Sequence, residues 1–353
     1  MQKTRPAVLK GSSRNFVSGS LKRRKAPCFN NFSCVETGDK ATFLTAYGRN
    51  FEVNRTAHKA RPAGGRSLIY GVTGHPLSHT LSPAIHNSLF RHYGLDAVYL
   101  VFERAPDKFD SNFIDGLKAM KVSGFNVTLP YKGPVMEFLD RIDPLAKRIA
   151  AVNTVVNRNG KLHGYNTDDY GFYMSMITRF RGFKFKDSTI LVLGAGGAAF
   201  GVAFTCLKHG CGRLIIANRT MKRAASLEKH LRKNFPAADI RLAELREDLI
   251  AAIKEQPDLI VNTTSWGLKQ NEKKSLISLK DCDSGTLVND IIYNPAKTPL
   301  LREAERRGLK NSNGLAMLLF QGFESFRIWT GMTPDYSLAK RIIFPSFPAQ
   351  IRG

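Results

Sequence analysis

The sequence lacks any apolar run that approaches the roughly 18 to 20 residues needed to cross a bilayer as a helix. Its best candidate is the interrupted stretch "GLAMLLFQGF", so a membrane-spanning protein is excluded from the interpretation. Cysteine is also scarce, with five residues scattered over 353, which argues against a disulfide framework and for a reducing compartment. No Cys-x-x-Cys pair is present and prolines separate the early histidines, so we predict no metal site.

Acidic residues are few in the first part of the chain. Residues 1–66 contain 14 Lys or Arg against 3 Asp or Glu, while the whole chain has a formal net charge of +24. Because this segment is also rich in serine and has no sustained apolar periodicity, we expect a basic, disordered extension. A transit peptide for a plastid or another organelle and a translation start placed too far upstream are the alternatives. A nucleic-acid arm is less favoured, so we predict a cytoplasmic protein, or an organellar one if the extension is a transit peptide.

Strands and helices alternate from about residue 67 onward. Short apolar runs predict strands at 67–74, 97–103 and 122–127, and a helical stretch is predicted near 109–120. In the helix after the first strand, Ser82 is the predicted N-cap, Pro83 the first helical residue and Gly94 the stop. The alternation predicts an α/β domain with a largely parallel sheet.

A second α/β unit begins near residue 188, with the stretch "STILVLGAGGAAFGVAF". A strand over 190–193 leads into a glycine turn and a helix, and further strands are predicted at 213–218, 258–264 and 286–293. Gly194, Gly196 and Ala199 fit the Gly-x-Gly-x-x-Gly/Ala fingerprint, which permits a tight turn and close approach of the backbone to a pyrophosphate. The pattern therefore predicts a dinucleotide site at the N-terminus of the helix.

The end of the next strand indicates which dinucleotide is bound. NAD enzymes normally place Asp or Glu there for the ribose 2′-hydroxyl, whereas this chain has "ANRTMKR", with Asn218, Arg219, Thr220 and Arg223. Guanidinium groups pair with a 2′-phosphate that an acid would repel. We therefore predict NADP; the alternative is that these arginines are solvated side chains on a basic surface.

Two polar stretches are candidates for the catalytic groups. "GFNVTLPYKG" places Asn126, Thr128 and Lys132 at the end of a predicted strand, and "GYNTDDYG" places Asp168 just before the dinucleotide-binding unit. A lysine beside a carboxylate can hold a substrate hydroxyl, stabilise its developing charge and transfer its proton. The same stretches suit an ordinary turn and a helix cap, and the residues alone leave these interpretations open.

Taken together, the motifs from about Ser67 onward resemble those of the shikimate dehydrogenase family. Eight motifs follow in order: "HTLSPAIHN", "GFNVTLPYK", "AAVNT", "GYNTD", "GAGGAA", "NRT", "DIIYNP" and "GLAMLLFQG". The resemblance implies two α/β domains across a cleft and reversible NADPH-dependent reduction of 3-dehydroshikimate to shikimate, a step of aromatic amino acid and chorismate biosynthesis. It implies a small-molecule substrate, no nucleic-acid or membrane partner, and a monomer or homodimer.

The resemblance also implies roles for individual residues. Lys132 and Asp168 correspond to the family's catalytic pair. The implied substrate contacts are Thr80 and Ser82 at the carboxylate, with Asn126, Thr128, Asn153, Tyr293 and Gln321. The implied cofactor contacts are Gly194, Ala195, Gly196, Gly197 and Ala198, with Asn218, Arg219, Thr220 and Arg223.

Domain limits follow from these assignments. We predict the basic extension at 1–66, a substrate-binding catalytic domain at 67–168, a Rossmann-type NADP-binding domain at 169–312 and C-terminal helices at 313–353. Gln321 implies that the final helix returns to the substrate-binding domain, which is then discontinuous in sequence.

Two positions depart from the family pattern. The family usually has Ser-x-Ser where this chain has Thr80-Leu81-Ser82, and an uncharged residue where Asp169 follows Asp168. A second carboxylate in the cleft would raise one pKa of the two acids; we expect instead that Asp169 faces solvent, where an acid at a helix start suits the dipole. Two other functions stay open: a quinate/shikimate dehydrogenase using NAD or NADP, and a non-catalytic relative that senses a ligand.

Overall fold

The computed structural model describes residues 64–253, 255–268 and 273–347, together with three short strands ahead of them. These strands, β1 (Cys34–Thr37), β2 (Lys40–Leu44) and β3 (Asn50–Asn54), pair antiparallel in one sheet. Their valine, threonine and phenylalanine residues favour extended structure, so the expectation of a disordered extension at 1–66 does not hold for them. The rest of residues 1–63 lies outside the described residues. None of the described helices has the length and apolar character that a bilayer-spanning segment needs.

The first large sheet contains six strands in the order β5-β4-β6-β8-β9-β7. They are β4 (Leu68–Gly74), β5 (Ala97–Glu103), β6 (Gly124–Val127), β7 (Arg141–Ile142), β8 (Thr154–Arg158) and β9 (Lys161–Tyr165). β4 runs parallel to β5 and β6, and β7 to β9, whereas β8 is antiparallel to both β6 and β9. The connecting helices are α1 (Ser82–His92), α2 (Ser111–Ala119) and α3 (Pro144–Ile149), with the short turns η1 (Pro106–Lys108) and η2 (Pro134–Phe138).

A hairpin between β8 and β9, which we did not predict, brings two motifs together. Asn159 and Gly160 have φ values of 52° and 85°, the positive values that a two-residue hairpin turn requires. Thr154 at the start of β8 lies opposite Tyr165 at the end of β9. The polar residues just before β8 and just after β9 therefore lie side by side at one edge of the sheet.

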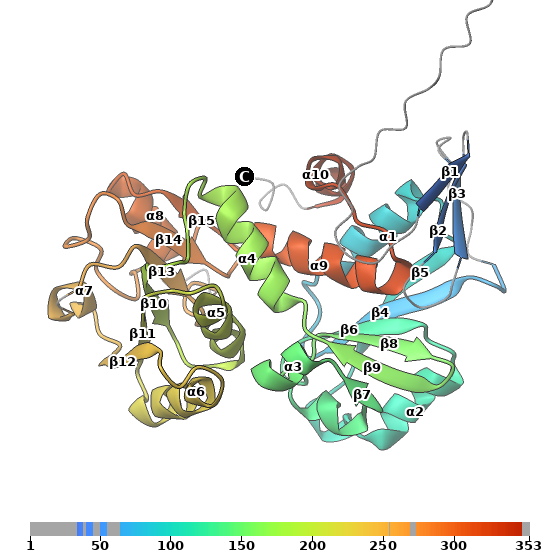
Figure 1. Cartoon of the computed structure of the whole chain (residues 1–353), viewed down its shortest axis with the longest axis horizontal. Coiled ribbons are helices and arrows are strands. Elements are labelled where there is room, and N and C mark those ends of the chain that lie inside the picture. Colours follow the sequence, from blue (N-terminus) through green and yellow to red (C-terminus); the bar gives the residue numbers. More distant parts are fainter. Residues whose placement is uncertain are drawn as a thin grey trace, which may run out of the picture.

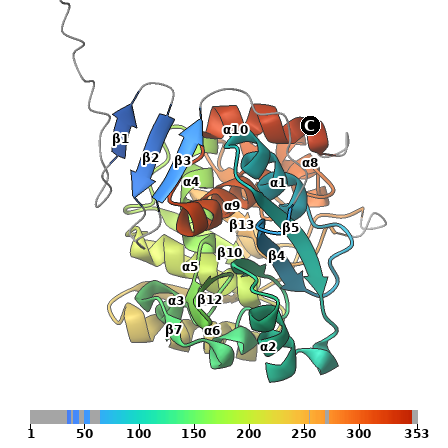
Figure 2. The same cartoon turned by 90° about the vertical axis from the view of Figure 1, so that its right-hand side faces the viewer.

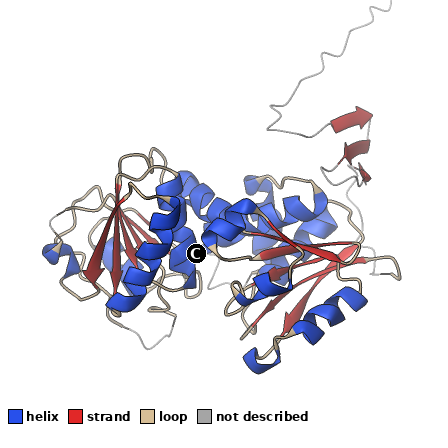
Figure 3. Ribbon diagram, turned by 60° about the horizontal axis from the view of Figure 1, so that its bottom comes forward, coloured by secondary structure: helices blue, strands red, loops and turns tan. Residues whose placement is uncertain are grey.

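The second large sheet has the order β12-β11-β10-β13-β14-β15, and all its neighbouring strands are parallel. Its strands are β10 (Thr189–Leu193), β11 (Arg213–Asn218), β12 (Asp239–Glu244), β13 (Leu259–Asn262), β14 (Leu287–Asp290) and β15 (Asn311–Ser312). Its helices are α5 (Gly197–Lys208), α6 (Met221–Asn234), α7 (Leu249–Ala252) and α8 (Pro299–Arg306). This is the doubly wound order, in which ligands bind at the carboxyl ends of the strands where the order reverses, beside β10. Figure 1 shows this unit on the left and the first sheet on the right, and Figure 3 shows both sheets between their helices.

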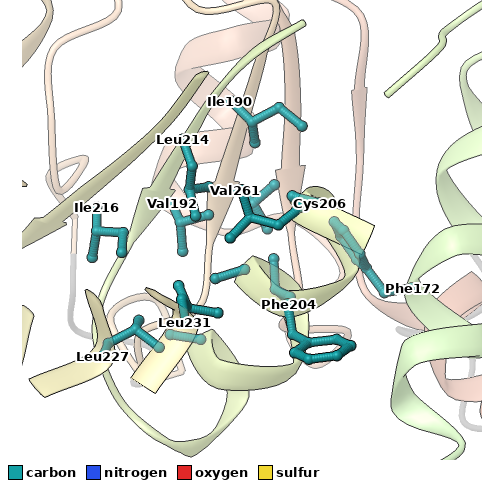
Figure 4. Packing of buried hydrophobic residues seen from close by; sticks show 14 of the residues in the cluster. Phe172, Ile190, Val192, Phe204, Cys206, Leu214, Ile216, Leu227, Leu231 and Val261 are labelled. Atoms are coloured by element: carbon teal, nitrogen blue, oxygen red, sulfur yellow. The ribbon is translucent and has the colours of Figure 1, made fainter. Parts of the chain in front are cut away.

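The second sheet is covered by apolar side chains on both faces, which explains the unbroken apolar runs of its strands. On one face, Figure 4 shows residues of β10, β11 and β13 packed against α5 and α6. The labelled residues of this cluster are Phe172, Ile190, Val192, Phe204, Cys206, Leu214, Ile216, Leu227, Leu231 and Val261. Leu191, Leu193 and Ile215 belong to the cluster on the opposite face. Residues 190–193 of β10 are thus buried on both faces up to the point where the glycine turn begins.

Two long helices connect the units. α4 (Asp168–Arg179) packs against both α5 and α9 (Leu315–Thr330), as Figure 1 shows. α4 and α9 pack closely at Gly171, where an added Cβ would lie 2.7 Å from Gln321 Cβ. α9 and α10 (Tyr336–Ile343) also pack against α1, so these two C-terminal helices lie beside the first sheet (Figure 2). The predicted boundary between residues 168 and 169 falls in the first turn of α4; it and the other predicted limits stay predictions.

Candidate active site

Lys132 and Asp168 form an ion pair between two stretches far apart in the sequence. Lys132 lies in the loop after β6, and its Nζ is 2.5 Å from Oδ2 of Asp168, the first residue of α4. The two side chains are 26% and 17% exposed, so the pair is accessible but largely shielded from water. Neither a turn nor a helix cap requires this contact. The geometry therefore favours the catalytic interpretation over the two structural ones.

The second carboxylate oxygen of Asp168, Oδ1, is held by a hydrogen bond from Asn153. Asn153 Nδ2 donates to Asp168 Oδ1 at 2.9 Å, and Asn153 Oδ1 accepts the backbone N–H of Thr167 at 2.8 Å. Asn166 Oδ1 in turn accepts the backbone N–H of Asp168 at 3.0 Å, as a helix-capping side chain does. The N-cap itself, Thr167, has no side-chain cap hydrogen bond, so the start of α4 is held by Asn166 one residue earlier and the side chain of Asp168 is left for Lys132.

Asn126 lies in a buried polar network below this pair. Its Nδ2 lies 3.0 Å from Asn153 O, 3.1 Å from Thr154 Oγ1 and 3.0 Å from Ser325 Oγ, and its Oδ1 accepts from Tyr99 OH at 2.7 Å. The amide is thus surrounded by protein partners, one of which is the backbone carbonyl of Asn153, and its predicted contact with a substrate stays a prediction. We had not singled out Tyr99 or Ser325 from the sequence. Ser325 gave no signal, because it occurs as one small polar residue within an apolar helix.

The hydroxyl cluster before α1 differs from the sequence interpretation. We predicted Ser82 as the N-cap, but the helix begins at Ser82 with Leu81 at the N-cap and no side-chain cap. Thr80 instead accepts the backbone N–H of Ser82 on its Oγ1 at 3.3 Å. Burial raises the pKa of Tyr99 well above its usual value, and a hydrogen bond with the Ser82 hydroxyl opposes this shift. Thr80 thus makes the side-chain hydrogen bond at the start of the helix, and the hydroxyl of Ser82 faces Tyr99 beneath the site.

The remaining predicted substrate contacts lie around the same region. Tyr293 follows β14 and packs against the apolar cluster of α1 and α9, and burial raises the pKa of its phenol. Gln321 is on α9, where its backbone carbonyl accepts from Ser325 Oγ at 3.0 Å and its Nε2 donates to Leu318 O at 2.8 Å. Thr128 begins the loop that leads to Lys132, and its methyl group lies 2.4 Å from the position that a Cβ on Gly74 would take. Their contacts with a substrate stay predictions.

The glycine turn has the shape that a pyrophosphate requires. Gly194 has a φ of 107°, and an added Cβ would lie 2.8 Å from Thr263 Oγ1. Gly196 is the N-cap of α5, and a Cβ there would meet nothing within 4 Å. The first turn of α5 contains no acid, and Ala199 is fully buried against the sheet. The turn therefore leaves open space beside a helix N-terminus, as anion binding requires.

Arg219 and Arg223 lie exposed where β11 ends and α6 begins. Asn218 Nδ2 donates to Thr220 O at 2.8 Å, which fixes the turn between them. Within the described part of the chain, the structure gives neither guanidinium an acidic partner. Both groups are therefore available for an anion, which fits the 2′-phosphate of NADP.

Asp169 is buried, contrary to our expectation that it faces solvent. It is 3% exposed, its Oδ1 accepts from Thr205 Oγ1 at 2.9 Å and its Oδ2 is 2.5 Å from Lys208 Nζ. The expectation was wrong because α5 packs over the first turn of α4 and replaces the solvent that a lone helix would have there. The carboxylate of Asp169 thus faces α5, where Lys208 neutralises it.

Models of known protein families match three stretches of this chain. Models of a "Shikimate dehydrogenase substrate binding domain", a "Shikimate / quinate 5-dehydrogenase" and a "Shikimate 5'-dehydrogenase C-terminal domain" match residues 72–155, 177–291 and 314–343. A shikimate dehydrogenase (NADP(+)) from Alkaliphilus metalliredigens is 39% identical over 280 residues, 79% of this chain and 97% of that protein. The chain belongs to the shikimate dehydrogenase family.

Solved members of the family have the same architecture. A shikimate dehydrogenase solved in complex with NADP+ superposes with a TM-score of 0.74 at 36% identity, over 81% of this chain and 98% of that one. A quinate dehydrogenase from Corynebacterium glutamicum, solved with NAD, gives a TM-score of 0.73 at 28% identity, over 80% and 99%. The predicted family and the predicted two-domain α/β fold with a Rossmann-type unit are confirmed. The roles of individual site residues stay predictions, because the family also contains a quinate enzyme.

Proposed function

We propose that the protein is an NADP-dependent shikimate dehydrogenase that reversibly reduces 3-dehydroshikimate to shikimate. The observation that carries this proposal is the contact of Lys132 Nζ with Asp168 Oδ2 at 2.5 Å, next to the glycine turn of a dinucleotide-binding sheet. A lysine held in this way can hydrogen-bond the carbonyl oxygen that gains charge during reduction and then give it a proton. Asp168 accepts from Lys132 and keeps the ammonium group directed at the substrate.

The cofactor, when bound, supplies the hydride for the carbonyl carbon. We assign its pyrophosphate to the turn from Gly194 to Ala198, where the backbone is open at Gly196. We assign its 2′-phosphate to Arg219 and Arg223, with Asn218 and Thr220 shaping the turn between them. Charge-assisted hydrogen bonds from both guanidinium groups would favour NADP over NAD.

The acid substrate is proposed to bind between the first sheet and α9. Its carboxylate is assigned to the hydroxyls of Thr80 and Ser82, and its ring hydroxyls to Thr128, Asn153, Tyr293 and Gln321. Asn126 is assigned an indirect part, because its amide already lies within hydrogen-bonding distance of three acceptors and accepts from Tyr99. This arrangement places the reacting carbonyl near Lys132.

An absorbance assay at about 340 nm with shikimate and NADP+ tests whether the protein is catalytic, since this is where reduced nicotinamide absorbs. We expect a steady increase in absorbance that depends on both compounds. A protein that binds shikimate or NADP+ in calorimetry but produces no NADPH would be a ligand-sensing relative, and the proposal would be rejected.

The two glycines of the turn give a matched pair of variants. In Gly194→Ala the methyl group would lie 2.8 Å from Thr263 Oγ1 in a backbone of positive φ, so we expect the free energy of unfolding to fall by about 1 to 3 kcal/mol along with NADPH affinity. In Gly196→Ala the methyl group meets no protein atom within 4 Å, so we expect weaker NADPH binding without a loss of stability. Urea unfolding and NADPH fluorescence titration measure the two effects. Wild-type NADPH affinity in Gly196→Ala would contradict the assignment of the pyrophosphate.

The N-terminal extension is proposed to take no part in catalysis. Among the residues from 64 onward, Ser67 donates from Oγ to Asp96 and so joins the start of the first sheet to the fold. We expect deletion of residues 1–66 to leave kcat and KM for shikimate unchanged. A large loss of activity in the truncated protein would show that the extension packs on the catalytic unit.

A further inference from the structure

The contacts of Asp169 connect the catalytic helix to the cofactor helix. Asp169 directly follows Asp168 on α4, and its carboxylate binds Thr205 Oγ1 and Lys208 Nζ on α5. α5 is also the helix that begins at the glycine turn. One side of α4 therefore provides Asp168, whose carboxylate holds Lys132. Another side of α4 is bound to α5, the helix that would contact the cofactor phosphates.

Stability alone is a weak explanation for this ion pair. The side chain of Asp169 is 5% exposed and that of Lys208 36%, and taking a carboxylate out of water costs several kcal/mol, which a single pair often only offsets. A buried ion pair can instead serve to fix one geometry out of several that the structure could adopt. Here the geometry they fix is the position of the first turn of α4 along α5.

The first turn of α4 lies close to α5 at one further point. A Cβ at Gly201 would lie 4.0 Å from Asp168 Cβ. Further along the same helices, the rings of Tyr173 and His209 stack with centroids 3.9 Å apart. The stacked rings and the apolar core hold the two helices together, so loss of the ion pair would permit a shift of the first turn without separating the helices.

We propose that Asp169 is a positioning residue, which acts through Lys208 and Thr205 to fix the catalytic carboxylate of Asp168 relative to the cofactor helix. The inference rests on the proposed function, because it assigns Asp168 to catalysis and α5 to the cofactor. Its consequence is that the ion pair affects the hydride-transfer step more than substrate binding. A misplacement of reacting groups by about 1 Å can cost roughly a hundredfold in rate.

The test compares Asp169→Asn, Lys208→Arg and the double variant Asp169→Asn/Lys208→Met. Asn keeps the size of Asp169 and a hydrogen bond to Thr205, and Lys208 can reach water in this variant. Lys208→Met alone would leave a buried carboxylate without its partner, which is strongly destabilising, so the double variant replaces it. Lys161→Met is the matched control, since it removes the Lys161 to Asp140 ion pair at 2.9 Å in the hairpin of the first sheet.

We expect kcat for shikimate oxidation to fall about tenfold in Asp169→Asn, with KM for shikimate within about twofold of wild type. The primary deuterium isotope effect on kcat should increase, because hydride transfer becomes slower relative to product release. The double variant should lose no more than Asp169→Asn, since both remove the same interaction. Lys208→Arg, which keeps a cation for Asp169, should retain most of the wild-type activity, and Lys161→Met should behave as wild type.

An active wild-type protein whose Asp169→Asn and double variants keep kcat within about twofold, with an unchanged isotope effect, would overturn the inference alone. A lower kcat accompanied by an equal loss in the fraction of folded protein, measured by urea unfolding, would also overturn it. A wild-type protein without turnover would contradict the proposed function, and this inference with it.

Discussion

Replacement of Lys132 by alanine should lower kcat by about 10² to 10⁴ while changing KM for shikimate much less. The lysine is the only group that we assign to the proton of the reacting oxygen, and its Nζ is 2.5 Å from Asp168 Oδ2. Without it, the charge that develops on that oxygen has no cationic partner, so the loss falls on the transition state rather than on binding. Steady-state kinetics with shikimate and NADP+ measure both constants.

Lys161→Ala is the control for this experiment. Lys161 is also paired with an aspartate, at 2.9 Å, but its side chain is 71% exposed in the β8–β9 hairpin. We expect its kinetics to match wild type. Near-normal turnover in Lys132→Ala would remove Lys132 from the catalytic assignment, whatever the control does.

Removal of both arginines at the end of β11 should change the cofactor preference. In Arg219→Ala/Arg223→Ala we expect KM for NADP+ to increase by about 10² or more, because each charge-assisted hydrogen bond contributes roughly 1.5 to 3 kcal/mol. KM for NAD+ should change little, since NAD+ has no 2′-phosphate. In the wild-type protein, KM for NADP+ should increase at high ionic strength, because salt screens the two exposed guanidinium groups.

Lys222→Ala is the matched control for the arginines. Lys222 is an exposed cation on the same turn of α6, so it tests whether general positive charge is sufficient. We expect Lys222→Ala to keep a KM for NADP+ close to that of wild type. A double-arginine variant that still prefers NADP+ over NAD+ to the wild-type extent would reject the assignment of these side chains to the 2′-phosphate.

Much of the fold could be predicted because its signals are local. The strands at 97–103 and 213–218 begin and end where their apolar runs do, as β5 and β11. Gly94 has a φ of 64° after α1, the left-handed conformation expected of a helix stop. The dinucleotide turn was predictable for the same reason: a buried strand, three small residues at fixed spacing and a helix follow each other directly.

Other features depend on contacts that a local pattern does not contain. The antiparallel hairpin was signalled by Asn159 and Gly160 and could have been predicted. The burial of Asp169 could not, because it depends on α5, whose Thr205 and Lys208 come 36 and 39 residues later. The Ser82 cap was wrong because the helix begins at Ser82 itself, with Leu81 at the N-cap and the backbone N–H of Ser82 bound to Thr80 Oγ1.

The candidate site shows the same division between local and long-range signals. Lys132 and Asp168 were recognisable as candidates, but the residues alone left the alternatives open until the 2.5 Å contact joined them. The support beneath them reaches much further along the chain. Ser325, which contacts Asn126 across 199 positions, has no local reason to be polar.

The most direct test of the central claim is kcat/KM for shikimate and quinate, each with NADP+ and NAD+. We predict the highest value for shikimate with NADP+, because we assign the 2′-phosphate to Arg219 and Arg223 and the carboxylate of the acid to Thr80 and Ser82. Thr80, where the family usually has serine, is the residue in this site whose added methyl group bears on the choice of acid. A higher kcat/KM for quinate with NAD+ would contradict the account.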